Sequence, residues 1–282
     1  MIIIVLSYNQ SAFLEDAINS VLMQEWASNW KIVIHDDAST DDSPRIIREI
    51  EKANPGKIIG ILQSTNRYSK QINIPVEIQK LVKSKYVARL DGDDVFISKS
   101  KLKKQMALME ENSCITLVSH KYEIINEEGE IVKHVRIRIG RFIGRYFLLL
   151  GNPIATPTAM YRSDAVNPLP EEFSKSRIQD WPLWVILSSR GCVAFEPELI
   201  SGYRIHSSNG FAGSDNKHFK IDTLSVHKML WGYSSGGHKY FIGILYLLVW
   251  LSFILDRLTF GYSVIAINKL RSVLMGYREV KP

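Results

Sequence analysis

Three aspartates stand within four positions of the chain, in the stretch LDGDDVF at residues 90–96. Asp91, Asp93 and Asp94 follow the apolar, β-prone run 86–88, and one glycine separates the first two. Like charges this close repel one another, and burying them is costly unless a positive group joins them. The stretch is therefore either a solvated turn at a strand end or a site for a hard divalent cation, which binds carboxylate oxygens and can also hold a phosphate.

Short apolar runs alternate with amphipathic ones up to about residue 110, a pattern typical of βαβ units on a parallel sheet. The strands are expected at 2–6, 31–35, 57–63 and 86–90, and the helices at 11–24, 43–54, 74–84 and 98–111. Ser43 followed by Pro44 predicts an N-cap and the first residue of the second helix. Polar clusters follow the first, second and fourth strands, at 7–9, 36–41 and 91–94. Ligands bind at this edge of such sheets, so acidic turns that share it favour a metal or a hydrogen-bond-donating ligand.

The middle of the chain is more mixed. Residues 114–137 predict a strand, an NEEG turn and a second strand, and 141–151 a short helix. A strand is then expected at 156–162, a helix closed by glycine at 178–191, and a last strand at 200–206. Neither GxGxxG nor GxxxxGK[ST] is present, so the sequence does not support a dinucleotide or P-loop site.

The composition is that of an ordinary globular protein, with 282 residues, 46% hydrophobic and 23% charged. The apolar start of the chain spans only about five residues and has no basic region before it, which predicts a first strand instead of a signal peptide and a cytosolic protein. Cys114 and Cys192 lack metal-site spacing, and we expect two reduced, mostly buried thiols.

The positive charge is concentrated in the C-terminal part of the chain. Residues 217–282 carry nine Lys/Arg against three Asp/Glu, which accounts for the whole net charge of +6. They also contain the charge-free run 240–255, which is short for a membrane span, and a second apolar run at 258–267. With several Trp and Tyr nearby, this pattern favours attachment to an anionic membrane face over nucleic-acid binding. The alternative is a helical hairpin that packs on the rest of the chain or on a second subunit.

Six motifs in order make the chain resemble glycosyltransferase family 2. They are VLSYNQSAFLEDAINSVLMQ, IVIHDDASTD, YVARLDGDDVF, TPTAMYRSD, IQDWPLW and YRIH, and the likeness runs from Ile3 to about His206. The resemblance implies a GT-A fold, an α/β domain with a mainly parallel Rossmann-like sheet flanked by helices. It places a catalytic domain at 1–210, with a nucleotide-sugar half at 1–97 and an acceptor half at 98–210. Residues 211–282 then form a helical C-terminal extension.

The resemblance also assigns roles to residues of the strand exits. Tyr8 matches the aromatic that stacks on the base of the nucleotide, although a core aromatic is the alternative. Asp37 matches the carboxylate that accepts a hydrogen bond from the base, while Asp36 and Asp41 are expected to shape the loop. Among Asp91, Asp93 and Asp94, one or two carboxylates would bind Mg²⁺ or Mn²⁺, with Asp93 the leading candidate, and another, Asp91, would reach the ribose.

Two residues further along match the acceptor side of the family's site. Asp180 matches the catalytic base, and its alternative is a helix N-terminal carboxylate stabilised by the helix dipole. His206 matches a histidine near the diphosphate and metal in some members, and a buried hydrogen-bonded histidine is the alternative. Two stretches depart from the family pattern. The phosphate-contacting pair before D-x-D is replaced by NRYSKQ, where Arg67 or Lys70 is the candidate, and glycine-rich HSSNGFAG stands where a lid is expected.

These roles imply an inverting, metal-dependent glycosyltransferase. It would use a nucleotide-sugar donor, expected to be a uridine one, and a saccharide or lipid-linked acceptor of surface polysaccharide synthesis. One base without a second carboxylate as nucleophile implies inversion. Two rival functions remain: nucleotidyl transfer, which usually needs a glycine-rich basic N-terminal loop that is not seen here, and a catalytically inactive sugar-binding or scaffold module of a membrane complex. Oligomerisation through the C-terminal helices is a further expectation.

Overall fold

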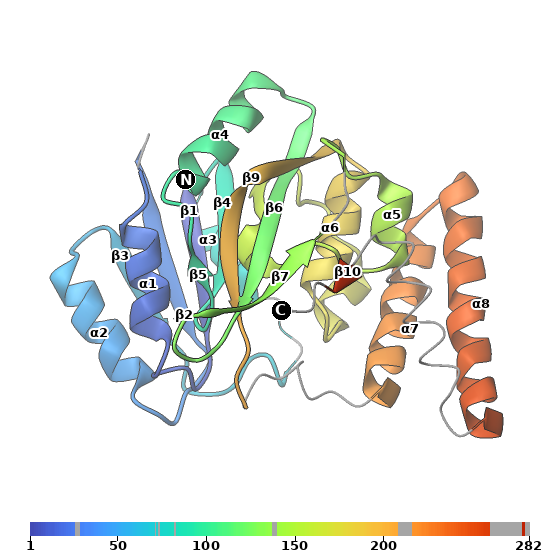
Figure 1. The fold of residues 1–282 in the computed structure, drawn as a ribbon, viewed down its shortest axis with the longest axis horizontal. Coiled ribbons are helices and arrows are strands. Elements are labelled where there is room, and N and C mark those ends of the chain that lie inside the picture. Colours follow the sequence, from blue (N-terminus) through green and yellow to red (C-terminus); the bar gives the residue numbers. More distant parts are fainter. Residues whose placement is uncertain are drawn as a thin grey trace.

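The computed structural model has a central mixed β-sheet with helices packed on it, and a helical hairpin at one side (Figure 1). It describes residues 1–25, 29–70, 72, 74–81, 83–136, 140–207, 216–259 and 278–279. The elements in chain order are β1 (Ile2–Ser7), α1 (Leu14–Leu22), β2 (Lys31–Asp36), α2 (Ser43–Ala53), β3 (Ile58–Leu62), α3 (Ile74–Leu81), β4 (Tyr86–Asp91), β5 (Val95–Phe96), α4 (Lys101–Glu111), β6 (Ile115–Ile125), β7 (Ile131–Arg136), α5 (Arg145–Leu150), η1 (Thr156–Thr158), β8 (Met160–Arg162), η2 (Glu171–Lys175), α6 (Asp180–Ser188), β9 (Cys192–Arg204), α7 (Asn216–Tyr233), α8 (Gly236–Thr259) and β10 (Arg278–Glu279).

The first half of the sheet is parallel, as the alternating pattern predicts. Its strands lie in the order β4-β1-β2-β3, and each pairs in parallel with its neighbour. The central strands are buried on both faces because helices cover each side, which explains their continuous runs of Ile, Val and Leu. Beyond β4 the order continues through β8 and β6, which pair antiparallel, and the long strand β9 lies parallel to β6. The expected α/β class is confirmed.

The second helix begins slightly earlier than predicted. Ser43 is the first residue of α2 and Asp42 occupies the N-cap position, with Pro44 in the first turn. The Ser43 hydroxyl does not cap the helix, because it accepts the backbone N–H of Gln10 at 3.2 Å. That bond instead ties the start of α2 to the loop that follows β1.

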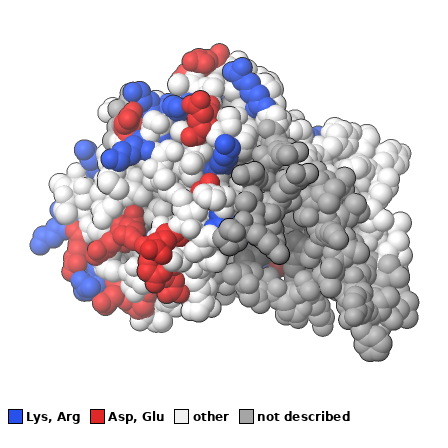
Figure 2. Space-filling model, viewed as in Figure 1, with Lys and Arg blue, Asp and Glu red and all other residues white. Residues whose placement is uncertain are grey.

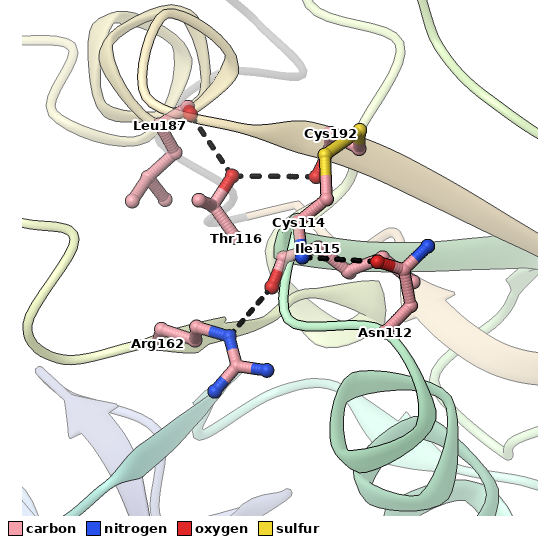
Figure 3. Close-up of a disulfide and its surroundings, with 7 residues drawn as sticks. All are labelled: Asn112, Cys114, Ile115, Thr116, Arg162, Leu187 and Cys192. Carbon is pink, nitrogen blue, oxygen red and sulfur yellow. Dashed lines mark hydrogen bonds between the residues drawn. A yellow bond between two sulfur atoms is a disulfide. The ribbon is translucent and has the colours of Figure 1, made fainter.

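The prediction of two reduced, mostly buried cysteines is wrong, since Cys114 is exposed and Cys192 only half-buried. Cys114 and Cys192 form a disulfide with 5.4 Å between their Cα atoms, across 78 residues of sequence (Figure 3). The cause is the topology: β6 and β9 are parallel neighbours whose first residues, Ile115 and Cys192, lie in register. The Cys192 N–H also donates to the Cys114 carbonyl at 2.7 Å. No feature of the local sequence predicts this disulfide.

The C-terminal hairpin packs into the main body of the molecule. Val226, Met229 and Leu230 of α7 and Ile242 of α8 are buried in the same hydrophobic cluster as Trp181 and Trp184 of α6. Hydrogen bonds strengthen this contact, since Arg190 donates to the hydroxyl of Tyr233 at 2.8 Å. Within the described residues, no helix combines the length and the hydropathy that a bilayer crossing requires. The apolar run 258–267 and the predicted boundary near residue 210 lie mostly outside the described part.

Candidate functional site

The three polar clusters meet at one edge of the sheet. Ser7 at the end of β1 lies in register with Asp36 of β2, and Leu6 lies in register with Asp91 of β4. The loops beyond them remain joined, because Asp37 donates its N–H to the Ser7 carbonyl and Gly92 donates to the Leu6 carbonyl. Parallel strands bring their carboxyl ends to the same side, so this convergence follows directly from the fold.

The loop after β1 leaves an aromatic side chain in solvent. Tyr8 keeps 49% of its surface exposed, which excludes the alternative of a core aromatic. The neighbouring backbone is held by the loop after β2: Asn9 donates its N–H to Ser39 and accepts the Thr40 N–H, both at 2.8 Å. Tyr8 therefore stands on a fixed loop at the rim of the sheet edge.

The aspartates of the acidic cluster after β2 contact different partners. Asp36 accepts two hydrogen bonds from Ser39, and Asp41 accepts the N–H groups of Ser11 and Ser43. Each carboxylate thus satisfies backbone donors within the loops, which confirms that these two residues shape the loop.

Asp37 is buried and contacts a different segment. Its carboxylate accepts the backbone N–H of Arg67 at 2.7 Å and that of Tyr68 at 3.0 Å. Arg67 in turn pairs with Glu77 of α3 at 2.8 Å. The departure from the family pattern therefore has a structural explanation, since the NRYSKQ stretch is anchored on the carboxylate that was expected to face the base.

The acids after β4 lie close to one another, with Asp93 and Asp94 buried and Asp91 half-buried. The pKa of Asp91 is raised to about 7, mainly by burial and also by the carboxylates of Asp93 and Asp180, while the nearby Arg89 and a hydrogen bond from Thr156 oppose the shift. Burial likewise raises the pKa of Asp94, with Asp93 and Asp91 as additional causes. A cluster with this charge pattern is stabilised by added positive charge.

The end of β9 holds the D-x-D segment in place. Asp94 accepts the backbone N–H of Arg204 at 2.9 Å, and the Arg204 side chain donates to the Asp93 carbonyl at 2.8 Å. His206 Nε2 lies 3.0 Å from Asp93 Oδ2. Arg204 is the last residue of β9 and is almost fully buried. Sequence reasoning missed it, because its partners Asp93 and Asp94 are distant in the sequence.

Asp180 faces this cluster from the first turn of α6. Its carboxylate accepts a hydrogen bond from the Asn152 amide at 2.7 Å and another from the N–H of Trp181. Burial raises the pKa of Asp180, and these donors together with Arg89 oppose the shift. A helix N-terminal carboxylate and a proton acceptor are therefore compatible roles for one side chain.

The donor set of Asp91 and Asp93 fits a hard divalent cation. Both are carboxylates at the exit of β4, and oxygen ligands of this kind are what Mg²⁺ and Mn²⁺ prefer. The mutual repulsion that raises the pKa of Asp91 is relieved by a bound cation. Within the described residues, no three His, Cys, Asp or Glu side chains are already grouped as a metal cage.

A cavity elsewhere in the molecule does not coincide with this site. It is lined by residues around the starts of β6 and β9, among them Leu108, Phe142, Phe195 and Glu198. That edge of the sheet is opposite the strand exits, because β6 runs in the same direction as β4. The glycine-rich segment expected as a lid lies mostly outside the described residues.

Relatives in curated collections of proteins include glycosyltransferases. An uncharacterized protein of Mycobacterium tuberculosis is 29% identical over 209 residues, which cover 73% of this chain and 59% of that protein. The Bacillus subtilis protein TuaG, named for teichuronic acid biosynthesis, is 27% identical over 233 residues, covering 80% of this chain and 89% of TuaG. The chain thus spans less than two thirds of the first of these relatives.

Solved structures show the same fold. Residues 1–349 of the S. aureus protein TarS, in complex with UDP-GlcNAc, align with a TM-score of 0.64 and 18% identity, over 89% of this chain and 72% of that TarS segment. The mannosyltransferase PcManGT from Pyrobaculum calidifontis, in complex with GDP-Man and Mn²⁺, aligns with a TM-score of 0.58 and 12% identity, over 96% of this chain and 80% of that one. These likenesses confirm the expected GT-A fold.

The model of the family described as glycosyl transferase family 2 matches residues 2–168. This segment carries all three strand-exit clusters and ends before Asp180 and His206. The match covers more than half of the chain and agrees with the fold and with the relatives. The chain belongs to glycosyltransferase family 2.

Proposed function

We propose that the protein is an inverting, metal-dependent glycosyltransferase of surface polysaccharide synthesis, with a uridine-linked sugar as donor. The observation that carries the proposal is the meeting of exposed Tyr8, the D-x-D acids and Asp180 around one sheet edge. The names of TuaG and of the UDP-GlcNAc complex of TarS support the pathway and the nucleotide.

The donor would lie across the ends of β1, β2 and β4. Tyr8 offers an exposed ring for stacking on the base, and Asp37 retains acceptor capacity beyond its two backbone partners. Asp91 and Asp93 would hold Mg²⁺ or Mn²⁺, with His206 beside Asp93, and Asp91 is also the candidate for the ribose hydroxyls. Asp94 would act mainly on the loop, because it accepts the Arg204 N–H. A bound cation would supply positive charge to the oxygens of the leaving diphosphate.

Asp180 would act as the general base. Its carboxylate removes the proton of an acceptor hydroxyl, and the oxygen attacks the anomeric carbon as the bond to the diphosphate breaks. The nucleoside diphosphate departs with the electron pair of that bond. A single displacement of this kind inverts the anomeric configuration, and the raised pKa of Asp180 makes it a better proton acceptor than an ordinary aspartate.

The acceptor would be a saccharide or a lipid-linked saccharide at the cytoplasmic face of the membrane. The supporting feature is the outer stripe of α8, whose apolar side chains recur at helical spacing and are exposed: Tyr240, Ile244, Leu247, Leu248 and Leu251. The opposite side of α8 is buried at Ile242 and Val249. In Figure 2, almost all described atoms at the α8 edge are uncoloured, so little charge lies there on the face in view. An apolar stripe on a positively charged C-terminal region suits an anionic lipid surface.

Substituting the stripe tests this attachment better than truncation, because α7 and α8 belong to the core. Leu247, Leu248 and Leu251 changed together to Ser should reduce co-sedimentation with phosphatidylglycerol vesicles. The matched control carries Ile131→Ser and Val132→Ser, which remove two exposed apolar side chains on β7. Equal binding of both variants would contradict a role of the stripe at lipid, and a loss of oligomer in the first variant would assign the stripe to a subunit interface.

The transfer itself is tested by incubating the purified protein with a panel of nucleotide sugars and Mn²⁺, followed by detection of the released nucleotide. Release from one uridine-linked sugar supports the proposal. Binding of a sugar nucleotide without any release, with or without acceptor, would favour the inactive binding module, and release of pyrophosphate from a nucleoside triphosphate and a sugar phosphate would favour nucleotidyl transfer.

A further inference from the structure

The segment between α5 and β8 forms hydrogen bonds with both Asp180 and Asp91. Asn152 donates from its amide Nδ2 to Oδ2 of Asp180 at 2.7 Å. Four residues later, the side chain of Thr156 hydrogen-bonds the Asp91 carboxylate. This one short segment therefore links the proposed base to the D-x-D segment. Asn152 is not among the site residues predicted from the sequence.

The orientation of the Asn152 amide is set by a second hydrogen bond. Its Oδ1 accepts the backbone N–H of Ile154 at 3.2 Å. Because an N–H can only be received by the amide oxygen, the NH₂ group must be the one that faces the carboxylate. The side chain is thus held at both ends, between its own loop and Asp180.

The backbone that carries Asn152 is fixed by two buried rings. Trp181, the neighbour of Asp180, donates from Nε1 to the Leu148 carbonyl at 2.6 Å. His227 of α7 places Nε2 3.2 Å from the Leu149 carbonyl, and its ring lies 5.5 Å from that of Trp181. The last turn of α5 is therefore tied to the helix that carries the base and to the C-terminal hairpin.

We propose that Asn152 is a positioning residue that fixes the carboxylate of Asp180 for proton removal from the acceptor. The proposal rests on the proposed role of Asp180 as the base. The amide holds one carboxylate oxygen, so the plane of the carboxylate cannot rotate freely toward the acceptor hydroxyl. Such orientation contributes to rate without contact with the substrate.

The groups around Asp180 determine how its titration responds to a change at Asn152. They are the N–H of Trp181, the amide of Asn152, the guanidinium of Arg89 and the carboxylate of Asp91. Arg89 and the two hydrogen-bond donors favour the ionised form of Asp180, whereas the charge of Asp91 opposes it. Removing the amide donor raises the pKa of Asp180, so the rate should begin to fall at a higher pH as the solution is acidified.

Two substitutions at residue 152 separate positioning from a structural role. Asn152→Asp has the same shape and keeps the acceptor for the Ile154 N–H, but it replaces the donor with a carboxylate that repels Asp180. Asn152→Ala removes both hydrogen bonds. If Asn152 has only a structural role, Asn152→Asp should keep more activity than Asn152→Ala. If Asn152 positions the carboxylate of Asp180, Asn152→Asp should be the less active of the two at neutral pH.

The experiment measures kcat, KM for the donor and the pH profile of kcat/KM for both variants, beside Asp180→Asn and the unchanged protein. We expect kcat to fall about 10-fold in Asn152→Ala and further in Asn152→Asp. The acidic limb of the profile should move to higher pH, and calorimetric donor affinity should stay unchanged. Normal kcat and an unmoved limb in both variants, or an Asp variant that is better than the Ala variant, would overturn the proposal. If Asp180→Asn itself retains turnover, the assignment of the base fails instead.

Discussion

His206 Nε2 lies 3.0 Å from Oδ2 of Asp93, although 113 residues separate the two in the sequence. The centre of the histidine ring also lies 4.7 Å from that of Phe13, the N-cap residue of α1, so its position depends on the loop after β1 as well as on the end of β9. The second acid of D-x-D is therefore held by a group that follows β9, far away in the sequence. In the proposed enzyme this contact keeps Asp93 oriented before a cation and donor arrive.

Asp93→Ala should abolish turnover. The substitution removes a carboxylate that would hold the cation, and the charge on the leaving diphosphate would then be left uncompensated. We expect a loss of at least about 100-fold in kcat. Initial rates with Mn²⁺, Mg²⁺ or EDTA measure the effect, and Glu49→Ala on the exposed face of α2 serves as the control. Full activity of the Asp93 variant, or of the unchanged protein in EDTA, would contradict metal dependence.

Asp180→Asn should lose catalysis while it keeps donor affinity. A general base acts on the acceptor and contributes in the transition state, so its removal is expected to lower kcat by about 10²- to 10⁴-fold. Calorimetry with the nucleotide sugar reports donor binding separately. A parallel fall of donor affinity and turnover would make Asp180 a donor ligand or a structural residue, and the base would have to be another group.

Local sequence was sufficient for features that depend on local geometry. Hydrophobic periodicity predicts the alternation of strands and helices, and turn-forming residues mark the strand exits. The same signals indicate that Asp36 and Asp41 shape a loop. Asn152 and Arg204 could not be found in this way, because each acts on a partner brought near only by tertiary structure. The cysteines failed for the same reason, since their pairing depends on the register between β6 and β9.

Lys101→Met should stabilise the protein at neutral pH. Lys101 is fully buried, with its Nζ 3.0 Å from Gln105 Oε1 and 3.9 Å from the centre of the Phe96 ring, and burial lowers its pKa well below the ordinary value of 10.5. Between this lowered pKa and 10.5, the unfolded chain binds more protons at this residue than the folded chain, so the free energy of unfolding falls as the pH drops through this range. Removing it should add about 1 kcal/mol or more near pH 7.

This gain should shrink as the pH rises toward 10.5, where the unfolded lysine also loses its proton. Denaturant melts of both proteins between pH 7 and pH 10 measure the difference. Lys103→Met on the same helix is the matched control, because Lys103 is exposed and makes only a surface ion pair with Glu25. A gain that is equal at both pH values would show that packing, and not charge, is responsible.

Removal of the disulfide should destabilise the fold without abolishing it. The bond joins the starts of two long neighbouring strands across 78 residues, so it restricts the unfolded chain strongly. We expect the double variant Cys114→Ser, Cys192→Ser to lose about 2–4 kcal/mol in the free energy of unfolding. Thermal melts with and without dithiothreitol give the same comparison in the unchanged protein. Two titratable thiols in the purified, denatured and unreduced protein would contradict the bond.

Two glycine substitutions should change stability in opposite directions. Gly191 precedes Cys192, and a Cβ there would fall inside contact distance of the Cys114 carbonyl and of the Thr116 side chain. One of these atoms belongs to the backbone, and the others belong to a threonine whose hydroxyl donates to the Leu187 and Cys192 carbonyls (Figure 3). They therefore cannot move aside without separating the first residues of β6 and β9. Gly191→Ala should therefore lower the free energy of unfolding by about 1–3 kcal/mol.

Gly232 provides the contrasting case, because it lies in the last turn of α7 and a Cβ there meets no atom within 4 Å. Gly232→Ala should raise the free energy of unfolding by about 0.5–1 kcal/mol, since alanine loses less conformational freedom in a helix. Denaturant melts of the two variants and the unchanged protein measure both changes in the free energy of unfolding in one series. If Gly191→Ala proved as stable as the unchanged protein, β6 and β9 would have to lie further apart at their first residues than the hydrogen bond between Cys192 and Cys114 allows.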